Sequence, residues 1–155
     1  MIIAMAADPS ALRLKEALKA YLETKGHTVS DWGTTETREV PFFTAAQSAS
    51  HAIQKGMAER GILLCGSGMG MAIVAGKHAG IIAACVESVY AARMCRAIND
   101  ANVLCLGAMI WGEAMAKEAV DVFLGTAHTE GLSHVREALL TSAEEVRKID
   151  ERTRK

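Results

Sequence analysis

The chain has 155 residues, of which 50% are hydrophobic and 23% are charged, but only 5% are aromatic. This size is usual for one globular domain, so we expect a single domain over residues 1–155, with a core of aliphatic side chains and methionine. The formal net charge of −1 supplies no basic field that would attract a phosphate backbone or an anionic membrane, which excludes nucleic acid and lipid as expected partners.

Short apolar runs alternate along the chain with longer segments of helical periodicity, and this pattern predicts alternating strands and helices. Strands are expected at residues 2–7, 27–33, 61–65, 81–86 and 103–106. Helices are expected at about 10–25, 42–56, from a glycine-rich turn to about 77, 88–97 and 112–124, with a last helix at about 133–152. The later turns of that last helix carry apolar residues among many charges, so we expect them to project toward a second subunit.

This order of elements predicts an α/β fold. We expect a three-layer, Rossmann-like sandwich with a five-stranded parallel sheet, helices on both faces and an extra C-terminal helix. The opening apolar run has no basic segment before it, and it is too short for a signal peptide or a membrane span. We therefore expect a cytoplasmic protein.

The four cysteines show no C-x-x-C spacing and no paired histidines at metal-ligand intervals, which argues against a metal site. In a reducing compartment they are expected to be free thiols. Cys85, Cys95 and Cys105 fall inside predicted strands or a helix, so we expect all three to be buried core thiols.

Cys65 ends the third predicted strand and is followed by a glycine-rich turn, Gly66, Ser67, Gly68, Met69 and Gly70. Ligands of open parallel sheets collect beyond the carboxyl ends of strands, where backbone amides and the dipole of the next helix attract anions. The same field favours a thiolate, so Cys65 is a candidate base or nucleophile. The alternative is that Cys65 is a small buried residue and the glycines form a plain tight turn.

The glycine spacing by itself does not indicate a dinucleotide site. It follows the third predicted strand instead of the first, and no acidic residue ends the next strand. We therefore expect no dinucleotide cofactor.

Two polar segments are candidates for binding a ligand. Asp8 follows the first predicted strand and faces the same rim as Cys65, although it is also suited to capping the first helix. Asn99 and Asp100 precede the fifth predicted strand, where an amide and a carboxylate orient hydroxyl groups; the alternative is an Asx turn that caps the preceding helix.

Together these motifs resemble the family of ribose-5-phosphate isomerase B and the galactose-6-phosphate isomerase subunits. The resemblance covers nearly the whole chain and is strongest at residues 64–70 (LCGSGMG), 77–81 (KHAGI) and 99–103 (NDANV). It implies a cofactor-independent aldose–ketose isomerase. In such an enzyme Cys65 moves a proton between C1 and C2 of an open-chain sugar, and the amides of the turn stabilise the enediolate.

The resemblance also implies which residues form the site. It gives a catalytic role to Cys65, with the Ser67 hydroxyl beside its thiol. It places substrate binding at Asp8, Gly66, Gly68, Met69, Gly70, Asn99, His134 and Arg136. It further implies a homodimer or homotetramer with sites shared between subunits, a heteromer being the alternative.

Several family positions differ here in ways that bear on the substrate. Ile98 stands where members that open a furanose ring carry a histidine, and Pro9 replaces another histidine. Met109, Ser133 and Glu137 stand where phosphate-binding arginines are usual. Ring opening by that histidine is therefore lost. The expected substrate is a small sugar or sugar phosphate of four to six carbons. One example is a short sugar phosphate held by Lys77, His134 and Arg136.

Three hypotheses about function follow. The first is the isomerase just described. The second is a non-catalytic subunit of a heteromeric isomerase or a sugar-binding module, because many ligand-binding positions have changed. The third is a nucleotide-binding regulatory domain, against which the missing acidic residue counts.

Overall fold

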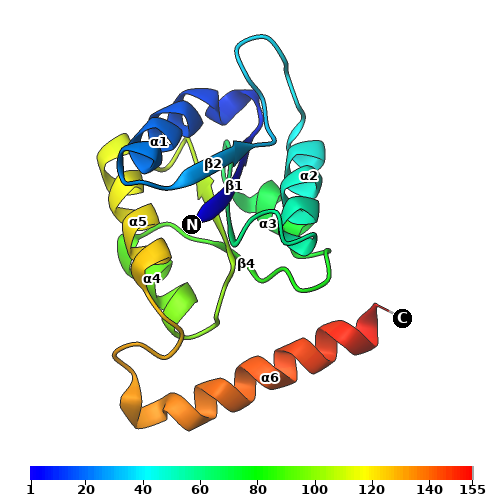
Figure 1. Cartoon of the computed structure of the whole chain (residues 1–155), viewed down its shortest axis with the longest axis vertical. Coiled ribbons are helices and arrows are strands. Elements are labelled where there is room, and N and C mark those ends of the chain that lie inside the picture. The colour runs from blue at the N-terminus through cyan, green and yellow to red at the C-terminus, as the bar shows by residue number, and fades with distance from the viewer. Residues whose placement is uncertain (155) are drawn as a thin grey trace.

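A computed structural model of the protein describes residues 1–154, and its elements follow the predicted alternation (Figure 1). The strands are β1 (Ile2–Ala7), β2 (Thr28–Asp31), β3 (Arg60–Cys65), β4 (Ala83–Cys85) and β5 (Val103–Gly107). The α-helices are α1 (Leu12–Thr24), α2 (Phe42–Gln54), α3 (Met69–Ala75), α4 (Val89–Ala97), α5 (Glu113–Gly125) and α6 (Arg136–Thr153), with 3-10 turns at η1 (Pro9–Ala11) and η2 (Ser133–Val135).

The five strands form one parallel sheet in the order β2-β1-β3-β5-β4. Gly61 pairs with Val103 at one end of the two central strands, and Cys65 pairs with Gly107 at the other. All strands therefore start at one edge of the sheet, here called the amino edge, and end at the opposite one, the carboxyl edge. The predicted α/β class and parallel sheet are confirmed.

Helices cover both faces of the sheet (Figure 1). Leu104 and Leu106 of β5 pack against α1, α4 and α5, whereas Val103 and Cys105 of the same strand pack against α2 and α3. Successive side chains of a strand point to opposite faces, so a strand that is apolar throughout must be covered on both sides. This arrangement is the predicted three-layer sandwich.

The face under α2 is built largely from alanine. Two alanines of β1 meet four alanines of α2, all at most 2% exposed: Ala4, Ala6, Ala45, Ala46, Ala49 and Ala52. Methyl side chains leave little between the helix and the strands, so the backbone of α2 lies close to the sheet.

Strands β2 and β4 are shorter than predicted, although the amides of Trp32 and Thr34 beyond β2 still donate to the Met5 and Ala7 carbonyls of β1. The expected fourth strand began at Ile81, but the Asn102 side chain accepts from the Ile82 amide (2.9 Å) and donates to the Gly80 carbonyl (2.8 Å), so β4 begins at Ala83. After β2 the chain passes beside the end of β1 at Gly33, where an added Cβ would lie 2.2 Å from the Ala7 nitrogen.

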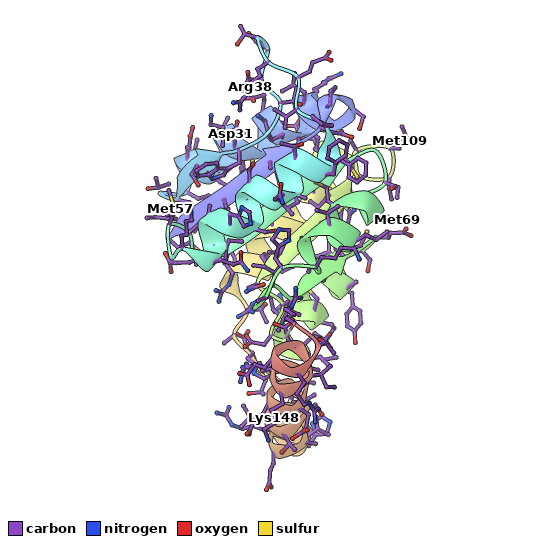
Figure 2. The ribbon with its side chains drawn as sticks, turned by 90° about the vertical axis from the view of Figure 1, so that its right-hand side faces the viewer. Asp31, Arg38, Met57, Met69, Met109 and Lys148 are labelled. Carbon is purple, nitrogen blue, oxygen red and sulfur yellow. The ribbon has the colours of Figure 1, made fainter. Side chains whose placement is uncertain are left out.

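Helix α6 stands apart from the three layers and crosses the amino edge (Figures 1 and 2). Its one buried residue is Ala143. The later turns, which we expected to project toward a second subunit, contact loops of the same chain: Arg147 pairs with Asp100 (3.3 Å), and Asp150 accepts from the Gly80 amide (2.8 Å). None of the helices within residues 1–154 is long and apolar enough to cross a membrane.

Candidate active site

Cys65 is the last residue of β3 and lies at the carboxyl edge with 6% of its surface exposed. The Gly68 amide donates a hydrogen bond to its Sγ atom at 3.1 Å. The Ala108 amide donates to the Cys65 carbonyl at 2.8 Å, which ties the same residue to the end of β5. The sulfur is therefore held in a fixed place at the start of the glycine-rich turn.

The turn after Cys65 lies directly on the end of β5. Gly68 has φ +79°, the left-handed conformation that glycine adopts at least cost, and it caps the start of α3. A Cβ at Gly68 would lie 2.9 Å from the Leu106 carbonyl carbon, and one at Gly107 would lie 2.6 Å from the Ser67 carbonyl carbon. Glycine at both positions allows the two backbones to touch.

Apolar side chains surround this turn. Met109 Cε lies 3.1 Å from the position that a Cβ at Gly66 would take, and the Phe42 ring lies 2.9 Å from the corresponding position at Gly70. Figure 2 shows Met69 and Met109 on the same side of the molecule. Both side chains are exposed, Met69 at 51% and Met109 at 82%. We call Phe42, Met69 and Met109 the apolar rim.

Two polar side chains accompany the thiol. The Ser67 Oγ accepts from the Met69 amide at 3.3 Å, so its own hydroxyl hydrogen remains available to a ligand. Asp8 accepts from the Ser10 amide (3.0 Å) and from the Ser10 hydroxyl (2.5 Å), which shows the helix-capping role considered from the sequence. The Asp8 amide also donates to the Leu64 carbonyl, placing this carboxylate beside the end of β3.

The prediction of three buried core thiols is wrong for Cys85, which is exposed. Cys85 ends β4 at the carboxyl edge, and its thiol donates to the Ser67 carbonyl at 3.7 Å. Ligands collect beyond the carboxyl ends of parallel strands, and Cys85 ends its strand as Cys65 does. The sequence therefore held a signal that Cys85 lies at this edge.

Cys95 and Cys105 are buried, as predicted. Burial raises the pKa of Cys95 to about 11 and raises that of Cys105 well above its usual value. Burial also raises the pKa of Cys85. These three thiols therefore stay protonated at neutral pH and are poor bases.

Asn99 lies far from Cys65 in space within one chain. Helix α4 runs back from the carboxyl edge, so Asn99 follows its end at the amino edge, exposed and next to Ile98. Strand β5 separates the two edges by roughly 13 Å, from about 3.3 Å per residue.

The predicted ligands near the C-terminus are also remote from the thiol. His134 lies exposed in η2, and Arg136 begins α6 with a guanidinium hydrogen bond to the Thr129 hydroxyl (2.9 Å). One chain thus brings together Cys65, Ser67, Asp8 and the turn, but not Asn99, His134 or Arg136. Within residues 1–154, no group of three or more His, Cys, Asp or Glu side chains is placed to hold a metal ion.

A family model described as Ribose/Galactose Isomerase matches residues 3–139. The chain belongs to the ribose/galactose isomerase family. This confirms the resemblance drawn from the motifs around Cys65 and Asn99, and it identifies the chain as a sugar isomerase of the aldose–ketose type.

Relatives in the ribose/galactose isomerase family align over most of their length. A 4-deoxy-4-sulfo-D-erythrose isomerase of Clostridium sp. (strain MSTE9) is 47% identical over 146 residues, covering 94% of this chain and 92% of the relative. A D-erythrulose-4-phosphate isomerase of Pectobacterium atrosepticum is 44% identical over 123 residues, covering 79% and 81%. The ribose-5-phosphate isomerase B structure from Clostridium thermocellum superposes with a TM-score of 0.89 at 31% identity, covering 99% of both chains.

Proposed function

We propose that this isomerase interconverts a four-carbon, open-chain aldose and its 2-ketose, with an anionic group on C4, by proton transfer at Cys65. The observation that carries the proposal is the thiol itself, fixed at the carboxyl edge by the Gly68 amide at 3.1 Å. The choice of a four-carbon substrate is supported by the two relatives that are 47% and 44% identical, both named for four-carbon sugars with a sulfonate or phosphate at C4.

The proposed reaction needs one base and a site for a negative oxygen. The Cys65 thiolate removes the proton from C2 of the aldose, and the electron pair moves toward the carbonyl to give an enediolate. Amides of the turn at 66–70 stabilise its oxygen, an effect worth roughly 3–4 kcal/mol per donor. The thiol then returns the proton to C1, so that the sugar is isomerised with no net oxidation and no cofactor.

Ser67 is placed to carry the second proton transfer of the reaction. Isomerisation also requires the hydroxyl proton on O2 to move to O1. The Ser67 hydroxyl lies two residues beyond the thiol and accepts from the Met69 amide while keeping its own hydrogen, so it can give a proton to one oxygen and take one from the other. We therefore assign it the transfer between O1 and O2.

The substitution at Ile98 suits a substrate of this kind. A furanose ring closes through a hydroxyl on C4 of an aldose, and a C4 sulfonate or phosphate removes that free hydroxyl. Such a tetrose has no furanose ring to open, so a proton-transferring side chain at position 98 would have nothing to act on.

Binding of the C4 anion would require a second copy of the chain. The three side chains of the apolar rim are uncharged and Asp8 at the same edge is a carboxylate, whereas His134 and Arg136 lie at the start of α6, away from Cys65 of the same chain. We propose that the amino edge of one copy faces the carboxyl edge of another, which would place Asn99, His134 and Arg136 around the substrate on Cys65 of the partner copy. Arginine binds such anions through paired hydrogen bonds.

The test is solvent isotope exchange. The purified full chain is incubated in deuterated water with 4-deoxy-4-sulfo-D-erythrose, D-erythrose 4-phosphate or ribose 5-phosphate, and loss of the C2 proton and appearance of ketose are followed by NMR. We expect turnover of at least one tetrose in preference to the pentose. Cys65→Ser should lower the rate by about 10²- to 10⁴-fold, the usual contribution of a general base.

Cys85→Ser is the matched control, because it removes a thiol from the same edge yet keeps a donor toward the Ser67 carbonyl. It should retain most of the activity. Equal rates for wild type and Cys65→Ser would refute the cysteine base. Sugar binding by calorimetry without turnover, with activity restored by a related chain, would instead support the non-catalytic subunit.

A further inference from the structure

A cavity of about 680 Å³ lies at the amino edge of the sheet, the edge opposite to the one that carries Cys65. Its walls are the amino ends of β3 and β4, the loop before β4, residues at and after the end of α4, and the later turns of α6. Six charged side chains line it: Arg60, Arg96, Arg147, Arg154, Asp100 and Asp150. Because four are cationic and two are anionic, the cavity carries an excess of positive charge.

The two carboxylates are already engaged. Asp100 accepts from Arg96 at 3.0 Å and from Arg147 at 3.3 Å. Asp150 accepts from the Gly80 amide at 2.8 Å and pairs with Arg154, and these hydrogen bonds lower its pKa. Each carboxylate is therefore already paired with at least one arginine of the cavity.

Arg60 is the unbalanced charge. It begins β3, is half-buried, and donates to the carbonyl of its neighbour Glu59 at 2.8 Å. No carboxylate among residues 1–154 lies within ion-pair distance of its guanidinium. Burial lowers the pKa of Arg60, and so does the positive charge of Arg96, so an anion between the two guanidinium groups would relieve both effects.

Arg96 is the buried arginine of the four that line the cavity. Its side chain is 5% exposed, and its Nε atom is buried without a hydrogen-bond acceptor in the described part of the chain. A buried donor left without an acceptor costs about 1–3 kcal/mol.

We infer that the amino-edge cavity binds a small organic phosphate, whose oxyanion is held by Arg60, Arg96 and Arg147. Its volume falls in the range of roughly 300–1,000 Å³ that is typical of small-molecule sites. Ile81, Val146 and Ile149 line the same cavity and supply apolar surface for the organic part of the ligand. The binding itself does not depend on the proposed reaction at Cys65.

A ligand at this place would join α6 to the sheet. Helix α6 buries Ala143 alone and meets the sheet through a few polar contacts, so an anion bound by Arg60 of β3 and Arg147 of α6 would add a bridge between them. Since α6 begins at Arg136, the bound anion would also restrict the element that carries this predicted substrate ligand. The site is therefore suited to an effector.

The test compares binding by wild type, Arg60→Gln and Arg93→Gln. Isothermal titration calorimetry with glycerol 3-phosphate, and separately with inorganic phosphate, is performed at constant ionic strength in a buffer free of other multivalent anions. Arg93 is the matched control because it lies on α4, as Arg96 does, but is exposed and outside the cavity. We expect Arg60→Gln to weaken glycerol 3-phosphate binding about tenfold or more, and Arg93→Gln to leave it within twofold.

The other outcomes would overturn the inference. Equal binding by wild type and Arg60→Gln would place the anion elsewhere, including the Cys65 edge. Equal weakening by both variants would show a general charge effect, and failure of wild type to bind either probe would exclude the site. Should Arg60→Gln fail to fold, Arg60→Lys and Arg147→Gln would provide the same comparison, and isomerase activity without phosphate should be unchanged in every folded Arg60 variant.

Discussion

Replacing Gly68 by alanine tests the construction of the turn behind the thiol. The left-handed backbone at φ +79° costs an L-residue roughly 1–2 kcal/mol. The new methyl group would also lie 2.9 Å from the Leu106 carbonyl carbon and 3.1 Å from the Gly107 nitrogen, both backbone atoms that cannot turn aside. Overpacking of this kind costs roughly 1–3 kcal/mol, so the free energy of unfolding should fall by about 2–5 kcal/mol.

Gly26→Ala is the matched control, because Gly26 has φ +81° and no atom within 4 Å of an added Cβ. It should lose only the conformational part, about 1–2 kcal/mol. Thermal unfolding at one fixed protein concentration separates the two variants, since each kcal/mol moves the Tm of a chain of this size by about 2–4 °C. Isotope exchange should fall only for Gly68→Ala, which displaces the amide from Cys65. Equal Tm losses for both variants would refute the close contact between the turn and β5.

Other perturbations test the core and the loops. Burial raises the pKa of Cys95 to about 11, so between pH 9 and 11 the thiol ionises in the unfolded chain first and stability falls by up to about 1.4 kcal/mol per pH unit; Cys95→Ala should flatten this slope in urea titrations. The ammonium of Lys15 is fully buried and bonded to Asp31 (2.5 Å) and to the Thr34 carbonyl (2.6 Å). Lys15→Met should therefore cost about 3–5 kcal/mol of unfolding free energy, because it removes the nearer and fully buried partner of Asp31 and leaves only Lys19 at 3.7 Å, and adding Asp31→Asn should restore part of it. A double variant no more stable than Lys15→Met would contradict that explanation.

The fold was predictable from the sequence because its signals are local. Short apolar runs such as residues 61–65, bounded by turn residues, indicate strands buried on both faces, and the helices between them have apolar stripes. Strand lengths were less predictable. The late start of β4 depends on Asn102, a side chain distant in sequence whose amide group replaces two backbone partners ahead of the strand.

The site was predictable only where its residues follow one strand. Cys65 and its turn were identified because strand and turn are contiguous, and Asp8 lies at the end of the adjacent strand. Periodicity gives no information on which loops from the two edges meet, so it could not show that Asn99 lies remote from Cys65 in one chain. The charged cavity around Arg60 was missed because its arginines come from β3, α4 and α6, without a shared motif.

Because the face beneath α2 is built from alanine, the position of that helix is sensitive to larger side chains but not to smaller ones. Ala45, Ala49 and their neighbours on β1 have almost no side chain left to remove, so shortening them opens little space. Any enlargement must instead lift the helix from the sheet. Phe42 is the first residue of α2, and its ring lies against Gly70. A single methyl group added near the other end of α2 would therefore displace the helix and move Phe42 away from the thiol site.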